Sequence, residues 1–176
     1  MADEKPIREK GADGQDSLFI VGIGASAGGL EALQQFFVRM PENSGISFVV
    51  IQHLSPDYKS LMADILGKHT AMAVLQVENG MEVKPDTVYL IPPKKNMTLK
   101  DGKLILSEIV QGTLNHPIDI FFTSLAAEEK ERGIAVILSG TGTDGTSGIK
   151  AMKEHGGLVL IQNPETAKFD GMPRSA

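Results

Sequence analysis

The sequence alternates between two kinds of apolar pattern, and this alternation limits the possible folds more than any other feature. Continuous apolar runs at residues 19–23, 48–51 and 134–138 have the length of buried strands. Between such runs, apolar residues recur at helical spacing, as Leu30, Leu33 and Phe37 do. Strands that alternate with helices form parallel sheets covered on both faces. We therefore predict a doubly wound three-layer α/β/α fold with a mostly parallel sheet.

The same patterns predict the remaining elements. Further strands are expected at residues 73–77, 88–91 and 158–161, and further helices at residues 61–67, 118–126 and 146–155. Two short apolar runs flank Asp101 and Gly102, a dipeptide that supplies the positive φ angles of a tight turn. We expect a small antiparallel hairpin there, at an edge of the sheet.

Composition limits the domain organisation and the chemistry. The chain has 176 residues, which suits one domain, and no cysteine, which excludes thiolate catalysis, disulfides and zinc fingers. Residues 1–17 are polar and charged, and we expect them to form a disordered leader ahead of one domain at residues 18–176. The absence of cysteine fits a reducing compartment, so the expected location is the cytoplasm.

Charge and hydropathy exclude two classes of partner. The formal net charge of −5 is not that of a protein that binds nucleic acid or an anionic membrane surface. No apolar run approaches the roughly 20 residues needed to cross a bilayer. We therefore expect neither nucleic-acid binding nor membrane insertion.

Polar residues follow three of the predicted strands at the edge where active sites of such sheets gather. Ser26 follows the first strand within a Gly-x-Ser-x-Gly segment, a pattern typical of a nucleophile elbow. His53 follows the second strand, and Asp144 follows the strand at 134–138. An imidazole can take the serine proton, and a carboxylate can orient the imidazole. The sequence therefore predicts a Ser26, His53 and Asp144 triad, with oxyanion donors from the first helix or from residues 140–142.

Each of these residues also has a purely structural interpretation. Ser26 could be a helix N-cap, His53 a half-buried residue that begins a loop, and Asp144 the cap of the helix that begins near Thr146. The other histidines, His69, His116 and His155, lack the spacing of metal ligands, so we expect no metal site.

A nucleotide-binding function is the second interpretation of the first turn. Gly22, Gly24 and Ala27 satisfy a loose dinucleotide fingerprint, but Gln52 and His53 stand where that motif needs an acidic residue. Residues 140–148 also lack the lysine of a phosphate-binding loop. We therefore expect no nucleotide cofactor.

The motifs around these residues resemble the chemotaxis protein-glutamate methylesterase family, CheB. The similar segments are IGASAGG at residues 23–29, QHL at 52–54 and GTGTDG at 140–145. The similarity continues through YLIPP at 89–93, NHPID at 115–119, QNP at 162–164 and GMPR at 171–174. It covers the chain from Leu18 to the end.

The resemblance implies a serine hydrolase that needs no cofactor. In that family the residue matching Ser26 is the nucleophile, the one matching His53 is the general base and acid, and the one matching Asp144 orients the imidazole. The implied substrates are methylated glutamates on cytoplasmic helices of chemoreceptors, from which methanol is released, and many members also deamidate receptor glutamines. One triad serves both reactions, because both pass through attack on a side-chain carbonyl.

Departures from the family pattern modify these expectations. The residues before Leu18 are too few to fold a receiver domain, so control by phosphorylation is not expected. The form of residues 115–119 is similar to that of methylesterase domains fused ahead of a CheR-type methyltransferase, which makes such a methyltransferase an expected partner. Residues 18–176 end before the last elements usual in the family, which implies a domain truncated at its C-terminal end. A non-catalytic module that docks on receptors or on the methyltransferase is the alternative function.

Overall fold

A six-stranded parallel sheet forms the centre of the protein. The computed structural model describes residues 18–53, 61–110, 112 and 114–176. Within these residues the strand order is β3-β5-β2-β1-β8-β9, and every neighbouring pair is parallel. The strands are β1 (Phe19–Ala25), β2 (Ile46–Gln52), β3 (Ala73–Gln76), β5 (Thr87–Leu90), β8 (Gly133–Ile137) and β9 (Leu158–Ile161).

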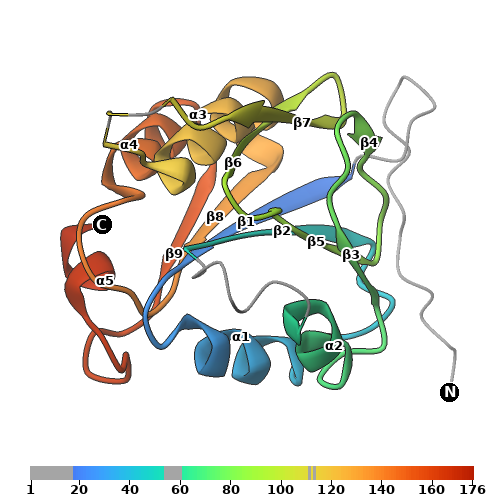
Figure 1. Ribbon diagram of the computed structural model, residues 1–176, viewed down its shortest axis with the longest axis horizontal. Helices are drawn as coiled ribbons and strands as arrows, with labels where there is room; N and C mark the ends of the chain where they lie inside the picture. The colour runs from blue at the N-terminus through green and yellow to red at the C-terminus, as the bar shows by residue number, and fades with distance from the viewer. Residues whose placement is uncertain (1–17, 54–60, 111, 113) are drawn as a thin grey trace, which may run out of the picture.

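Helices cover both faces of this sheet, which confirms the predicted three-layer architecture (Figure 1). Helices α1 (Gly29–Phe37) and α2 (Leu61–Gly67) cover one face. Helices α3 (Pro117–Glu129) and α4 (Thr146–Glu154) lie on the other. The 3₁₀ turn η2 (Lys130–Arg132) follows α3, and the short helix α5 (Gly171–Ser175) ends the chain. No helix within the described ranges is long and apolar enough to cross a membrane.

Alternating residues of β1 divide the core into two parts. Val21, Ile23 and Ala25 pack in the cluster that contains residues of α1 and α2. The opposite face of β1 carries Gly22 and Gly24, where an added Cβ would meet side chains of α3 at 3.0 and 2.6 Å. The two glycines therefore allow α3 to lie against the strand that precedes Ser26.

The predicted hairpin is confirmed, and the structure adds a third strand to it. Strands β6 (Lys95–Lys100) and β7 (Lys103–Glu108) are antiparallel, and β4 (Met81–Glu82) pairs with β7. Asp101 and Gly102 have φ angles of 49° and 70°, as expected for the turn. These three strands form a separate sheet that has no ladder hydrogen bonds with the main one.

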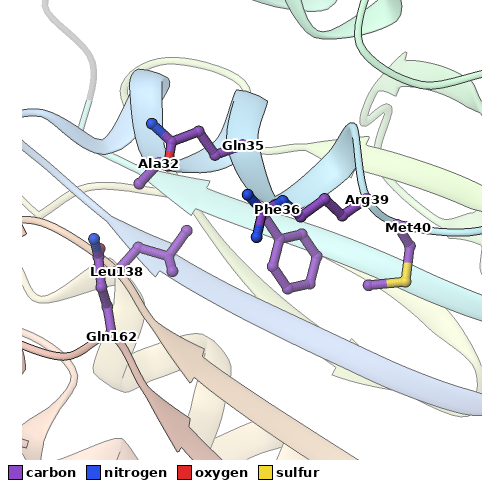
Figure 2. Close-up of a pocket in the computed structure, with 7 residues that line it drawn as sticks. All are labelled: Ala32, Gln35, Phe36, Arg39, Met40, Leu138 and Gln162. Atoms are coloured by element: carbon purple, nitrogen blue, oxygen red, sulfur yellow. The ribbon is translucent and has the colours of Figure 1, made fainter. Parts of the chain in front are cut away.

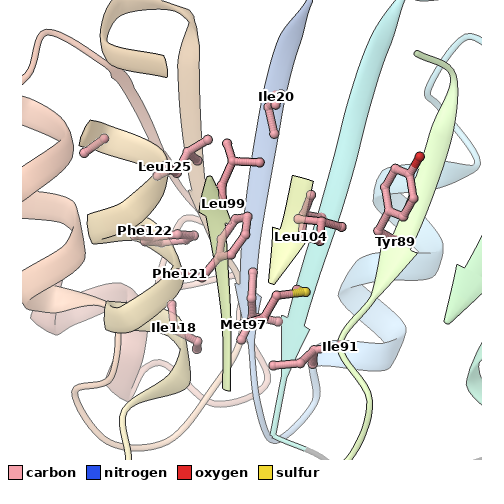
Figure 3. Packing of buried hydrophobic residues seen from close by; sticks show 14 of the residues in the cluster. Ile20, Tyr89, Ile91, Met97, Leu99, Leu104, Ile118, Phe121, Phe122 and Leu125 are labelled. Carbon is pink, nitrogen blue, oxygen red and sulfur yellow. The ribbon is translucent and has the colours of Figure 1, made fainter. Parts of the chain in front are cut away.

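This small sheet packs on the core, which differs from the predicted place at an edge of the main sheet. Met97, Leu99 and Leu104 are at most 2% exposed and belong to the same cluster as Ile20 and Phe121 (Figure 3). In addition, the Leu99 amide donates a hydrogen bond to Ser124 Oγ of α3 at 2.9 Å. The burial of these side chains holds the hairpin beside α3. The apolar pattern of the hairpin does not predict this contact.

Predicted and observed boundaries differ by only a few residues. Strand β1 runs two residues beyond the expected end, and α3 extends to Glu129. Helix α5 was not expected, because its five residues include a glycine and a proline and show no helical period.

Candidate active site

The register of the sheet places Ser26 and His53 at neighbouring strand ends. Ala25, the last residue of β1, pairs with Gln52, the last residue of β2. Ser26 follows the first of these strands directly, and His53 follows the second. The His53 amide donates to the Ala25 carbonyl at 3.2 Å, which continues the ladder past the strand end. On the other side of β1, the Ser26 amide donates to the Ser139 carbonyl at 3.0 Å. The chain after β8 therefore lies beside Ser26.

His53 and Asp144 are joined across this edge by a hydrogen bond. The His53 Nε2 atom lies 2.8 Å from Asp144 Oδ2. The carboxylate side chain is only 5% exposed, whereas the imidazole is 34% exposed. With a neutral imidazole, Nε2 carries the proton toward the carboxylate and Nδ1 keeps a lone pair. The structure therefore brings together two of the three predicted residues, which are 91 positions apart.

Ser26 stands at the turn between β1 and α1 without capping the helix. The N-cap of α1 is Gly28, with φ 70°, so the N-cap interpretation of Ser26 is wrong. The residue is partly exposed, and none of the described residues forms a hydrogen bond with its hydroxyl. In particular, no such bond joins Ser26 Oγ to His53, a contact that often tightens only when substrate is bound.

Asp144 is held by the amino end of α3. Its Oδ2 accepts a hydrogen bond from the Ile118 amide at 3.1 Å, and its Oδ1 accepts one from the Asp119 amide at 3.0 Å. The expected alternative, that Asp144 caps the helix beginning at Thr146, is therefore wrong. The N-cap of α4 is Gly145. The same Oδ2 atom therefore faces both the first turn of α3 and the imidazole of His53.

The backbone donors near Ser26 are divided between used and unused amides. Gly29 donates to the Ser26 carbonyl at 2.9 Å and Gly140 donates to the Phe169 carbonyl at 3.0 Å, so these two amides are occupied. The Thr141 and Gly142 amides donate no hydrogen bond among the described residues, and both residues are exposed. Both amides of the 140–142 turn are therefore free to donate to an oxyanion.

Gly140 explains how this turn approaches the serine. A Cβ at position 140 would lie 2.9 Å from Ser26 Cβ and 2.2 Å from Met172 Sδ. The Met172 amide donates to the Gly140 carbonyl at 2.9 Å, so α5 holds the turn in place. Only a residue without a Cβ fits between α5 and Ser26.

Several residues that organise the site were not expected from the sequence. Ser139, 1% exposed, donates from Oγ to the Ala27 carbonyl at 2.8 Å and accepts from the Phe169 amide at 3.0 Å. Gln162 accepts a hydrogen bond from the Ser139 amide at 2.8 Å. Asp119 also belongs to this group, and its place in the first turn after Pro117 is a sequence signal for a helix cap.

Three side chains, one of them Asp144, form a group that resembles a metal-ligand set. His116, Asp119 and Asp144 offer ligand atoms within 4.8 Å of one another. Both carboxylates, however, already accept backbone N–H groups at the starts of two helices. The positive ends of those helices favour anions over a cation, so the arrangement supports helix capping.

The remaining histidines have separate surroundings. His116 Nδ1 lies 3.7 Å from Asp144 Oδ1, too far for a hydrogen bond. His155 lies at the end of α4, and its Nδ1 is 2.9 Å from the Ala151 carbonyl oxygen. His69 follows α2, and its amide donates to the Leu66 carbonyl at 2.8 Å.

A hollow of about 340 Å³ lies beside α1 and contains none of the predicted triad (Figure 2). Gln35, Phe36 and Arg39 line it from the side of α1, and Leu138 and Gln162 from the ends of β8 and β9. The imidazole of His53, 34% exposed, therefore lies outside this hollow.

The model of the CheB methylesterase family matches residues 21–176. The chain belongs to this family. The crystal structure of the Thermotoga maritima CheB methylesterase catalytic domain superimposes on this CheB-family chain with a TM-score of 0.82. The two are 34% identical, and the match covers 90% of this chain and 87% of that one. The predicted resemblance and fold class are thereby confirmed.

Curated relatives extend the comparison. The Thermotoga maritima protein-glutamate methylesterase/protein-glutamine glutaminase is 35% identical over 161 residues, which are 89% of this chain and 47% of that protein. A relative from Rhodobacter capsulatus, "Uncharacterized 104.1 kDa protein in hypE 3'region", is 51% identical over 115 residues. Those residues are 65% of this chain and 12% of that protein. This CheB-family chain therefore corresponds to a part of each of these longer proteins.

Proposed function

We propose that the chain is a serine hydrolase that removes methyl esters from glutamate side chains of chemoreceptors and releases methanol. The observation that carries this proposal is the hydrogen bond between His53 and Asp144 beside Ser26, in a chain of the CheB methylesterase family. The names of its relatives support both this activity and deamidation of glutamine side chains.

The proposed reaction begins with proton transfer from Ser26. The Nδ1 lone pair of His53 takes the hydroxyl proton, while the Nε2–H group keeps its hydrogen bond to Asp144. The serine oxygen attacks the ester carbonyl carbon, and the negative charge moves to the carbonyl oxygen. When this tetrahedral intermediate collapses, the methoxide takes the proton from the imidazolium and leaves as methanol. Water, deprotonated by the same imidazole, then cleaves the acyl-serine and restores the hydroxyl.

The amide of Thr141 is the proposed donor to the oxyanion. It lies in the turn that Gly140 brings against Ser26, and it has no other hydrogen bond among the described residues. A donor of this kind contributes about 3–4 kcal/mol to transition-state stabilisation in enzymes where it has been removed. Because the donor is backbone, the side chain at position 141 does not decide this contribution.

A protein substrate fits the position of the site. The imidazole is 34% exposed on the rim of the sheet, outside the hollow beside α1. A glutamyl ester on a receptor helix can reach such a rim without entering an enclosed pocket. We propose cytoplasmic receptor helices as the substrate, the cytoplasm as the place of reaction, and a CheR-type methyltransferase as a partner.

Replacement of Ser26 tests the proposed function directly. We expect Ser26→Ala to abolish methanol release from methylated receptor, because no nucleophile remains, while circular dichroism stays that of the parent. Ser107→Ala, which removes an exposed serine hydroxyl from β7, is the matched control and should keep full activity.

Two outcomes would contradict the proposal. One is hydrolysis by Ser26→Ala at the parental rate. The other is receptor binding by the parent chain with neither methanol release nor labelling of Ser26 by an organophosphonate, which would support a non-catalytic docking module instead.

A further inference from the structure

Helices α3 and α4 both begin without a cap from their own N-cap residue. The N-cap of α3 is His116 and that of α4 is Gly145, and neither provides a side-chain hydrogen bond. The first amides of any helix lack partners within the helix and need acceptors from elsewhere. Each helix in this pair therefore depends on an acceptor outside its own N-cap.

The two helices supply these acceptors to each other through Asp119 and Asp144. Asp144, one residue before the N-cap of α4, accepts from two amides of the first turn of α3. Asp119, in that same turn of α3, accepts with Oδ1 from the Gly145 amide at 3.0 Å and from the Gly148 amide at 2.7 Å. The caps are thus reciprocal, and four hydrogen bonds join the two helix starts.

One of these bonds acts next to the proposed catalytic carboxylate. The Gly145 amide belongs to the peptide that links Asp144 to Gly145, so Asp119 anchors the backbone directly after Asp144. Gly145 has φ 102°, a region that glycine enters without a steric cost. Without the bond to Asp119, this peptide would lose the contact that fixes its plane, and with it the direction of the Asp144 side chain.

We propose that Asp119 is a positioning residue for the triad. Through its bonds to α4, it holds Asp144 where the carboxylate fixes the tautomer and orientation of His53. Its catalytic consequence rests on the function proposed above. Asp119 itself accepts from backbone amides, and no hydrogen bond among the described residues joins it to Ser26 or His53.

The variants separate the hydrogen bonds of Asp119 from its charge. Asp119→Ala removes the acceptor for both α4 amides, whereas Asp119→Asn keeps a side-chain oxygen in the same place. Asp64→Ala is the matched control, because it removes an exposed carboxylate from the first turn of α2. If Asp119→Ala fails to fold, Asp119→Ser, with a shorter side chain, replaces it in every measurement.

The first measurement does not depend on turnover. The nitrogen shifts of the His53 imidazole, assigned among the four histidines with a His53→Gln sample, report which ring nitrogen carries the proton. We expect the parent, Asp119→Asn and Asp64→Ala to share one tautomer, protonated on Nε2. Asp119→Ala should show a mixture of tautomers. A folded Asp119→Ala with the parental imidazole spectrum would overturn the proposal, whether or not the parent hydrolyses esters.

The second measurement is the kinetics of methanol release. We expect Asp119→Ala to lower kcat by on the order of 10²-fold with KM unchanged, as for other misplaced catalytic groups, and Asp119→Asn to restore most of kcat. In an Asp144→Asn background, Asp119→Ala should cost little more, because both changes remove the same orientation of His53. Independent, multiplying losses in the double variant would also overturn the proposal. An inactive parent with the expected imidazole spectra would contradict only the proposed function.

Discussion

Asp144 has two sets of hydrogen-bond donors, and this determines what a substitution at that residue does. One donor is the imidazole of His53, and the others are amides of α3. The Asp144 side chain is 5% exposed and Ile118 is fully buried, so loss of the carboxylate would leave the Ile118 amide without an acceptor and out of water. A change at this residue therefore alters both the proposed chemistry and the packing of a helix.

Asp144→Asn should separate these two effects. The side-chain amide can donate to His53 Nε2 and so favour the wrong tautomer, which should lower kcat by on the order of 10⁴-fold. If the NH₂ group faces a helix amide instead, two donors meet and one hydrogen bond is lost. We expect a loss of about 1–3 kcal/mol in the free energy of unfolding. Methanol release and urea unfolding measure the two effects. A parental kcat in a stably folded variant would contradict the role of Asp144.

Glu129, the last residue of α3, provides a pH-dependent contribution to stability. Burial raises the pKa of Glu129 above its ordinary value of 4.5, and the nearby Arg132, 3.2 Å away, offsets only part of that rise. The folded protein therefore binds this proton at a higher pH than the unfolded chain does. Its stability rises as pH falls through the raised pKa, and the gain is complete below 4.5.

Glu129→Gln should consequently stabilise the protein at neutral pH. We expect a gain of less than about 1 kcal/mol at pH 7, which vanishes below the ordinary pKa of 4.5. Thermal unfolding across this pH range measures it. Glu154→Gln changes an exposed glutamate at the end of α4 and controls for the effect of helix-end charge alone. A variant less stable than the parent at pH 7 would show that the bond to Arg132 outweighs burial.

At the scale of elements, the contact between α3 and α4 depends on the absence of a side chain at one position. A Cβ at Gly148 would lie 2.5 Å from Phe122 Cβ and 3.3 Å from Asp119 Cα. Both atoms belong to rigid parts of α3, so the helices would have to separate. The reciprocal caps lie at this same contact, and their lengths depend on it.

Gly148→Ala should therefore destabilise the protein, although alanine favours helices more than glycine does. We expect a loss of about 1–3 kcal/mol from overpacking, together with a fall in kcat through displacement of Asp144. Gly67→Ala, at the end of α2, is the matched control, because an added Cβ there meets no atom within 4 Å. It should be neutral or stabilising by up to about 1 kcal/mol. Equal stabilities of the two variants in urea would refute this account.

At the scale of the whole molecule, the small sheet and the main sheet share one core. Leu104 of β7 is fully buried in the cluster that contains Ile20 of β1, Tyr89 of β5 and Phe121 of α3. The small sheet also hydrogen-bonds to α3 through Leu99. Because they share these contacts, the two sheets should unfold together.

Leu104→Ala tests this shared core. Removal of a fully buried leucine side chain should cost about 2–5 kcal/mol and lower the midpoint of a single unfolding transition. Leu160→Ala, on β9, removes a side chain that is 48% exposed and should cost much less. Two separate transitions in Leu104→Ala, one for each sheet, would show that the sheets fold independently.

Local sequence patterns predicted the layers of the fold, which the structure confirms, and the residues of the candidate site. Apolar periodicity is a local property, so it predicted the strands of the main sheet and the main helices to within a few residues. The placement of Ser26, His53 and Asp144 at strand ends followed, because parallel strands share one carboxyl edge. The pairing of His53 with Asp144 is confirmed, and their catalytic roles with Ser26 remain predictions.

The packing of these elements against one another depends on tertiary contacts that local sequence patterns do not contain. The hairpin packs on α3, Asp144 caps α3 in place of α4, and Asp119 returns the bond to α4. These features depend on how closely two helices or two sheets approach, and that approach depends on residues such as Gly148 and Leu104 from distant parts of the chain. A local sequence pattern does not predict such contacts, because neither residue of a contacting pair is unusual within its own segment.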